Sequence, residues 1–206
     1  MSTRTRLTAF QKWVTENLCE GKSMKTPGET DFSVVYTEPR CFVALYPWTL
    51  NEASAYSVAP SILIIPDASK GKDIRGKSYD QSEGVNRPQN LGAQLNLNLI
   101  YCVYDPGDRT AELKITQNPY TDILEGNNGG FYTMTDWIDE TMEKLLQAQT
   151  IPGSDLFLYE DSLTWFPLTE GETILDRRPL YYGVLQVGFG GEAQRRQGKD
   201  IKQLLD

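Results

Sequence analysis

Apolar side chains recur at helical spacing near the start of the chain. Leu7, Phe10, Val14 and Leu18 follow one another at intervals of three or four residues, which places them on one face of a helix. Gly21 and the polar run 22–28 after it are typical of a helix stop and a loop. The pattern therefore predicts an amphipathic helix that ends before Gly21.

A second helical pattern extends from Met134 to Ala148, after a glycine-rich run 126–130 that predicts a flexible joint. Thr133 or Thr135 is expected to cap its N-terminus. Acidic residues there suit the positive end of the helix dipole, and one of them begins a favourable i,i+4 pair with Lys144. These acidic residues are Asp136, Asp139 and Glu140. The stripe expected to be buried is Ile138, Thr141, Met142 and Leu145.

The clearest strand pattern lies at residues 95–104. Apolar residues alternate with Asn96 and Asn98 in its first half, whereas Ile100, Cys102 and Tyr104 make both sides apolar in its second half. We therefore expect this strand at the centre of the sheet.

Shorter strand patterns flank this central one. Asp31–Thr37 and Cys41–Leu45 predict a hairpin or one bent strand, and Ser61–Ile65 predicts a short strand between two prolines. Further strands are expected at Leu156–Tyr159, Leu163–Phe166 and Leu180–Phe189. The last is so apolar that it should lie inside a sheet or be paired by another subunit.

The order of these elements predicts an α+β fold with a mixed, largely antiparallel sheet and two main amphipathic helices packed on one face. At 206 residues, we expect a single domain over residues 1–190. Residues 67–92 carry almost no large apolar side chains and predict a long flexible loop or arm, and residues 191–206 predict a C-terminal extension.

Composition limits the classes of function that the chain can have. With 20 Lys and Arg against 28 Asp and Glu, the net charge of −8 argues against a protein that grips nucleic-acid backbones. No apolar run is long enough to span a membrane, and no secretory signal pattern follows Met1, so a cytoplasmic site of synthesis is expected. The chain has no histidine, which removes the commonest general base and transition-metal ligand.

Other sequence features give little indication of a catalytic, metal or cofactor site. Cys19, Cys41 and Cys102 lack metal-binding spacing and are expected to be reduced. Gly188–Ala193 matches a dinucleotide-binding fingerprint, but too few residues follow it to build the βαβ unit, so we interpret it as a flexible exit from the last strand. The acidic pair Glu160-Asp161 suits a turn. No catalytic residue, metal site or cofactor is therefore predicted.

Aromatic residues stand out instead. The neighbours of Tyr46-Pro47-Trp48, of Trp165 and of the pair Tyr181-Tyr182 are mostly apolar or neutral, which favours core or subunit-interface packing over nucleic-acid binding.

The chain resembles the tail terminator or tail completion proteins of bacteriophages and phage-tail-like particles. The features that carry this resemblance are the N-terminal helix, the proline-bounded strand Ala59–Pro66, the long central strand, the second helix, Trp165 and the run Arg178–Leu185. The resemblance covers the order of elements over most of the chain.

The resemblance implies a non-enzymatic α+β subunit that forms a ring, commonly six-fold, at the head-proximal end of the tail tube. Its implied partners are other copies of itself, the tail tube protein, and a sheath or head–tail connector. The candidate interface residues are Trp48, Trp165, Arg178, Tyr181, Tyr182, Ile201 and Leu204. Two alternatives remain open: a small carboxylate enzyme with Mg²⁺ held by Asp136, Asp139 and Glu160, and an acidic partner-binding module such as an inhibitor or antitoxin.

Overall fold

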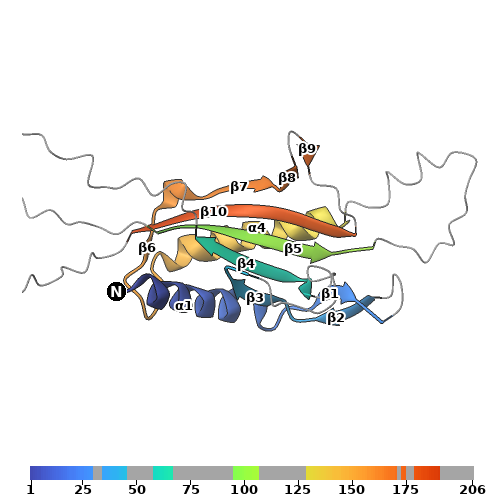
Figure 1. Ribbon diagram of the computed structural model, residues 1–206, viewed down its shortest axis with the longest axis horizontal. Coiled ribbons are helices and arrows are strands. Elements are labelled where there is room, and N and C mark those ends of the chain that lie inside the picture. Colours follow the sequence, from blue (N-terminus) through green and yellow to red (C-terminus); the bar gives the residue numbers. More distant parts are fainter. Residues whose placement is uncertain are drawn as a thin grey trace, which may run out of the picture.

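A computed structural model describes residues 1–29, 34–45, 58–66, 95–106, 129–170, 173–174 and 179–190. The expected loop at 67–92 and the expected extension at 191–206 lie outside these ranges. The described residues build an α+β fold around one main sheet (Figure 1).

The main sheet has six strands in the order β3-β4-β5-β10-β6, with β7 also paired to β10. Only β3 and β4 run parallel, and every other pair in this sheet is antiparallel. The prediction of a mixed, largely antiparallel sheet is confirmed. The strands are β3 (Arg40–Val43), β4 (Ser61–Pro66), β5 (Leu95–Tyr104), β6 (Phe157–Leu158), β7 (Thr164–Pro167) and β10 (Leu180–Gly190).

The apolar strand β10 lies inside the sheet, as expected. It pairs with β5 from Leu180 to Phe189, and with β6 and β7 along its other edge. The expected glycine-rich exit is wrong in part, because Gly188 and Gly190 belong to the strand itself. A Cβ on Gly190 would lie 2.1 Å from the Phe157 ring, so this glycine makes room for an aromatic side chain on the neighbouring strand.

The first predicted helix is present as α1 (Thr3–Val14), followed by one π-helical turn, η1 (Thr15–Cys19). Ser2 caps α1, because its hydroxyl accepts a hydrogen bond from the Thr5 backbone N–H at 3.2 Å. Of the predicted apolar face, Phe10, Val14 and Leu18 are fully buried.

Helix α4 spans Gly129–Ala148 and begins earlier than predicted. The expected N-caps are wrong: the Thr133 hydroxyl lies inside the helix and donates to the Gly129 carbonyl. The expected glycine joint is wrong at its end, since Gly129 and Gly130 open the helix. A Cβ on Gly130 would lie 2.3 Å from the Tyr181 ring, so close packing explains this glycine.

Because α4 starts earlier, no acidic residue occupies its first turn. The acidic residues therefore do not lie at the positive N-terminal end of the helix dipole, as had been expected. The predicted pair of Glu140 and Lys144 is confirmed at 2.7 Å. Glu140 also pairs with Lys22, and the Trp137 indole donates to the Leu18 carbonyl at 3.1 Å. These contacts join α4 to the end of η1.

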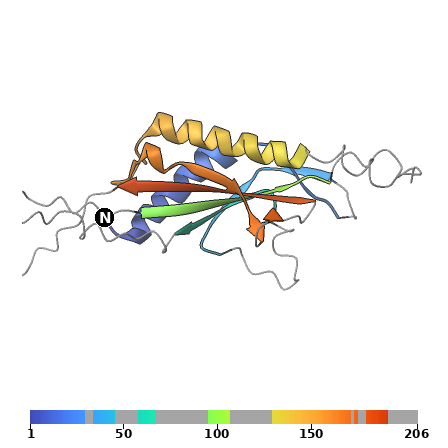
Figure 2. The same cartoon turned by 90° about the horizontal axis from the view of Figure 1, so that it is seen from above.

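Both helices pack on the same face of the sheet (Figure 2). Phe10 of α1 meets Phe189 of β10 edge to face at 5.1 Å between ring centroids, and Trp137 of α4 meets Tyr101 of β5 at 5.3 Å. Within the predicted stripe of α4, Ile138, Thr141 and Leu145 are buried, whereas Met142 is half-buried. The predicted arrangement of helices is confirmed.

The N-terminal region corrects one strand prediction. Residues 24–27, expected in a loop, form strand β1 (Met24–Pro27), which pairs with β2 (Val34–Thr37) in a separate two-stranded ribbon. The hairpin expected between Asp31–Thr37 and Cys41–Leu45 is wrong, because β3 pairs with β4 instead. A 3₁₀ turn, η3 (Glu160–Ser162), and a small ribbon of β8 (Thr169–Glu170) and β9 (Thr173–Ile174) complete the described elements.

One buried ion pair fixes α1 to the chain beyond α4. The Arg6 guanidinium donates to both carboxylate oxygens of Asp155, at 2.7 and 2.6 Å. Arg6 is only 5% exposed. Such a two-point contact restrains orientation as well as distance.

Candidate functional site: an interaction surface

The two faces of the sheet differ in what covers them. On the helix-covered face, Leu99 of β5 lies opposite Leu185 of β10, and both are fully buried. The opposite face, here called the open face, takes the alternate residues of the same strands. Its small buried cluster of Ala59, Cys102, Tyr104 and Leu180 contains no helical residue.

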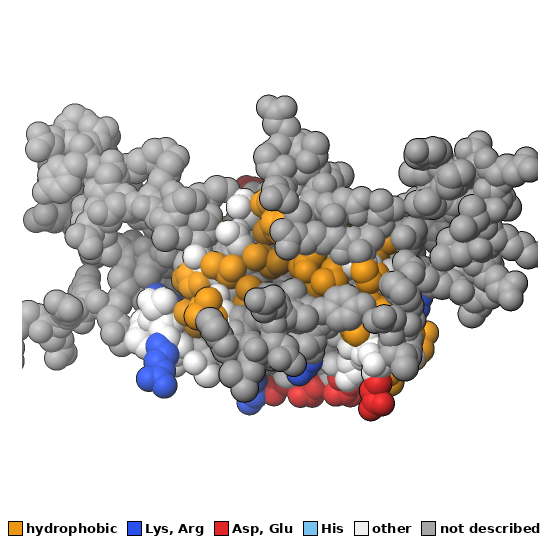
Figure 3. Space-filling model, turned by 45° about the vertical axis from the view of Figure 1, so that its right-hand side comes forward, with side chains coloured by type: hydrophobic (Ala, Val, Ile, Leu, Met, Phe, Trp, Pro, Cys, Tyr) orange, Lys and Arg blue, Asp and Glu red, His pale blue; other side chains and the backbone are white. Residues whose placement is uncertain are grey.

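The open face carries many apolar residues, of which Leu63 and Val184 are buried, at 6% and 4% exposure, whereas Phe166 and Phe157 are exposed. The strand registers place Leu63, Ile100, Val184 and Phe166 in one row across four neighbouring strands. Phe42, Ile65, Tyr182 and Phe157 extend this surface along the strands. Figure 3 shows hydrophobic side chains in a band across the visible surface, with acidic side chains grouped along one border.

Several aromatic rings on the open face are exposed to solvent. Phe157 is 43% exposed and Phe166 is 38% exposed, and Tyr159 packs edge to face on Phe157 at 5.3 Å. Single exposed apolar residues need no explanation, but a contiguous patch is typical of an interaction site. The open face is therefore the strongest candidate surface in the described part of the chain.

The open face also contains a buried acceptor without a donor. The Asn98 Oδ1 atom, central on β5, is buried and lacks a hydrogen-bond partner among the described residues. Buried polar atoms are nearly always paired in folded proteins, and each exception calls for an explanation.

The β1–β2 ribbon is a second exposed surface. All four residues of β2 are exposed, with Val35 at 52% and Tyr36 at 61%. Among the described strands β2 pairs only with β1. Two-stranded ribbons are marginally stable alone, and exposed apolar edges favour association.

Side-chain contacts anchor the ribbon to the end of the sheet. Lys25 pairs with Asp105 just past β5 at 2.8 Å, and the Thr26 hydroxyl donates to the Ala59 carbonyl at 2.7 Å. The ribbon therefore has a defined position, even though its outer strand is exposed.

The edge of the main sheet at β3 is less open than β2. The Gln11 side chain donates to the Cys41 carbonyl at 3.2 Å, and the Leu45 N–H donates to the Val43 carbonyl at 2.8 Å. These bonds occupy two carbonyl groups that a pairing strand would need. Strand addition is thus better supported at β2 than at β3.

The predicted interface residues fall in different places. Trp165 and Tyr181 pack against the core on the helix-covered face, whereas Tyr182 lies on the open face. Trp48, Arg178, Ile201 and Leu204 lie outside the described residues. Phe157, Phe166, Val35 and Tyr36 were not selected from sequence, although all four belong to strands or strand-like runs.

The carboxylates proposed for an enzyme do not converge. Asp136 and Asp139 are exposed on α4, and Glu160 accepts a hydrogen bond from Gln149 beyond the other end of that helix. The helical rise separates Asp136 from Gln149 by roughly 20 Å. In the described ranges, no three His, Cys, Asp or Glu side chains gather as a metal ion requires.

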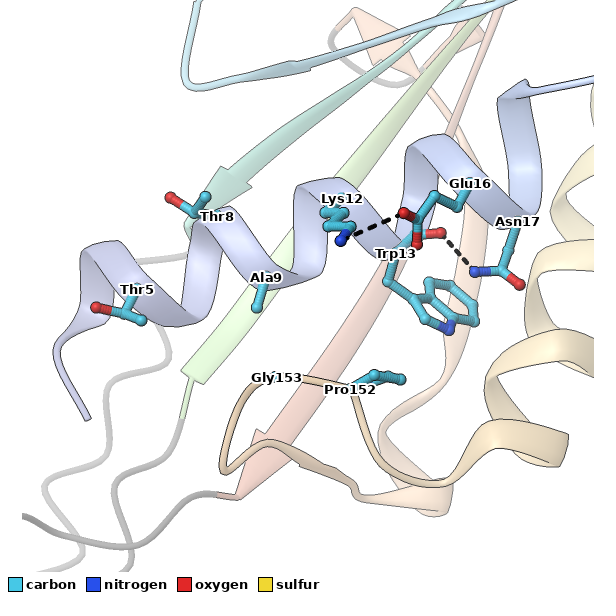
Figure 4. A pocket seen from close by; sticks show the side chains of 9 residues that line it. All are labelled: Thr5, Thr8, Ala9, Lys12, Trp13, Glu16, Asn17, Pro152 and Gly153. Carbon is cyan, nitrogen blue, oxygen red and sulfur yellow. Dashed lines mark hydrogen bonds and ion pairs between the residues drawn. The ribbon is translucent and has the colours of Figure 1, made fainter.

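A groove of about 490 Å³ lies between α1 and the loop at Pro152 and Gly153 (Figure 4). Trp13 lines it, and its charged groups, Lys12 and Glu16, form an exposed ion pair at 3.5 Å. The remaining lining is Thr5, Thr8, Ala9, Asn17, Pro152 and Gly153. Exposed charges that neutralise each other do not provide an acid–base pair for catalysis.

The three thiols are free and poorly suited to nucleophilic chemistry. Burial raises the pKa of Cys19, Cys41 and Cys102 to about 12 in each case. The thiolate is the reactive form, so these side chains are protonated and unreactive at neutral pH.

Comparison of the chain with protein-family models, curated proteins and solved structures finds no match. Within the described ranges, neither helix is long and apolar enough to cross a membrane.

Proposed function

We propose that this chain is a structural subunit that assembles with copies of itself into a ring, acting as a tail terminator or tail completion protein of a phage or phage-like particle. The observation that carries the proposal is the exposure of two aromatic rings, Phe157 and Phe166, on the open face, which is the side of the sheet away from both helices. The exposed β1–β2 ribbon supports it. The order of helices and strands supports the narrower assignment through its resemblance to that family.

The proposed ring would sit at the head-proximal end of the tail tube. Its partners would be other copies of this chain, the tail tube protein, and a sheath or head–tail connector. An acidic ring suits this position, because a net charge of −8 would not retain DNA passing through the ring.

Light scattering after size-exclusion chromatography, run over a range of protein concentrations, tests self-assembly. We expect the wild-type chain to form a discrete multimer, and the double variant F157S/F166S to shift toward monomer. The matched control, Y132S/L146S, removes two apolar residues from α4 that are 60% and 42% exposed, and should leave the multimer unchanged.

Co-sedimentation with isolated tail tubes tests the narrower assignment. The multimer should pellet with the tubes, and tubes carrying it should resist further elongation. A chain that stays monomeric at every concentration and does not bind tubes would exclude the proposal.

A further inference from the structure

We infer that residues 195–202 of one copy, here called the basic segment, dock at the β6 edge of the main sheet in the next copy. The receiving site, here called the edge site, consists of the exposed rings of Phe157 and Tyr159 and the carboxylates of Glu160 and Asp161. The inference rests on the proposed self-assembly and names the two surfaces that perform it.

The edge site is open to solvent within one chain. Phe157 is 43% exposed and Tyr159 is 36% exposed, and their rings meet edge to face, 5.3 Å apart and at 82° to each other. Glu160 and Asp161 follow directly in η3, and both are exposed. A partner can therefore reach both rings and both carboxylates.

The backbone holds the two rings in place. A Cβ on Gly190 would lie 2.1 Å from the Phe157 ring, so this ring lies against the backbone of β10. The Tyr159 N–H donates to the Gly188 carbonyl at 2.9 Å, and an isolated bridge joins Phe157 to Thr150 on its other side. Groups that are already positioned have less freedom to lose on binding.

Two exposed rings beside two carboxylates suit a guanidinium group. Guanidinium stacks on aromatic rings, and its N–H groups match the geometry of a carboxylate. No cation among the described residues pairs with Glu160 or Asp161. Glu160 instead accepts a hydrogen bond from the neutral Gln149 side chain at 3.3 Å. The edge site can therefore accept a positive charge.

The basic segment supplies such groups. The chain as a whole is strongly acidic, yet residues 195–202 contain four basic residues and one acidic residue. The basic residues are Arg195, Arg196, Lys199 and Lys202. Acidic surfaces of two copies repel each other, whereas this segment attracts them. Charge complementarity thus selects the basic segment as the occupant.

Position favours a neighbouring copy over the same chain. Strand β10 ends at Gly190 beside β6, and the Phe157 ring already lies against that glycine (Figure 1). Only four residues separate Gly190 from Arg195, so the same chain would have to reverse its direction within them. Extended, this stretch reaches roughly 17 Å, which is enough to meet a neighbour. Contacts between two different surfaces generate rings when the rotation closes.

Two charge variants test the contact. R195S/R196S disables the basic segment and E160K/D161K disables the edge site, and circular dichroism and urea midpoints verify that each variant is folded. By light scattering, each variant alone should be monomeric at concentrations where wild type is a multimer. An equimolar mixture should form a heterodimer and nothing larger, because it retains one intact pair of surfaces.

D136K/D139K is the matched control, since it reverses two exposed carboxylates on α4 and should leave the multimer unchanged. A monomeric control would show that overall charge, rather than the edge site, governs assembly, and would overturn the inference. If either test variant assembles as well as wild type, or if their mixture stays monomeric, the inference fails while self-assembly stands. If wild type is monomeric throughout, the proposed self-assembly fails as well.

A second test keeps the charge and removes the planar groups. R195K/R196K should weaken assembly about fivefold, because lysine stacks less well on aromatic rings. In an F157L/Y159L background, which lacks the rings, the same change should have no further effect. An equal loss in both backgrounds would show that the arginines do not contact these rings, and would exclude docking at the edge site.

Discussion

The two faces of the main sheet are built from alternating residues of the same strands, yet they differ in what covers them. Leu99 points to the helices and is fully buried, whereas its neighbour Ile100 points to the open face and is half-buried. On the first face, packing is complete within one chain. On the second, the Phe157 and Phe166 rings remain exposed, and the buried Asn98 amide oxygen has no hydrogen-bond partner among the described residues.

Adjacent substitutions on β5 measure this difference most directly. L99A should lower the free energy of unfolding by about 3 kcal/mol, since it leaves a cavity under the helices. I100A should cost about 1 kcal/mol, because part of that side chain is already in contact with solvent. Urea unfolding of dilute protein measures both. Equal losses would show that the two faces are packed alike within the monomer.

The buried ion pair beneath α1 should produce the next largest effect. Removing the Asp155 charge with D155N weakens both charge-assisted hydrogen bonds from Arg6, at a cost of about 2 kcal/mol. The hydrogen bond from Arg6 lowers the pKa of Asp155 from 3.8 to about 2. A lowered folded-state pKa stabilises the protein above the unfolded value, and this stabilisation is lost as the pH falls from about 4 to about 2.

Urea midpoints measured between pH 6 and pH 2 test the sign of this linkage. The wild type should lose part of its stability below pH 4, and D155N should lose less over the same interval. D139N is the control, because Asp139 is exposed on α4. Parallel curves for wild type and D155N would show that the ion pair does not stabilise the fold.

The helix-covered face was also the easier one to predict from sequence. Helical spacing identified Phe10, Val14 and Leu18, and alternation identified β5, because burial on one side imposes a period on the residues. Strand β1 was missed because Met24–Pro27 has few apolar residues and ends in proline. The start of α4 was missed because Gly129 and Gly130 look like a loop until the neighbouring Tyr181 ring is in place.

The open face could not be predicted in the same way. Trp165 and Phe166 are adjacent, and only the register with β10 decides that Trp165 packs under the helices while Phe166 faces outward. A shift of one residue would exchange them. Pairing of β2 with β1 likewise depends on contacts between distant residues. Sequence therefore indicated aromatic interface candidates but not the side on which each one lies.

A smaller effect is expected from one buried hydroxyl on the covered face. The Tyr101 hydroxyl donates to Thr141 Oγ1 at 2.8 Å, and Thr141 donates onward to the Trp137 carbonyl. Y101F removes one bond without leaving a buried donor unpaired, so it should cost about 1 kcal/mol. Y36F removes an exposed hydroxyl and should leave monomer stability unchanged. A loss in Y36F equal to that in Y101F would contradict the contrast.

The smallest effect should come from the ion pairs at the rim of the helical layer. Lys144 contacts Glu140 at 2.7 Å and donates to the Asn17 carbonyl, but Glu140 keeps its pair with Lys22 when Lys144 is removed. K144A should therefore cost about 0.5 kcal/mol, and less at 1 M salt. K12A, which removes an exposed pair on α1, should change nothing measurable. A cost for K144A as large as that of L99A would mean that charges at the rim, rather than packing on the sheet, hold α4 in place.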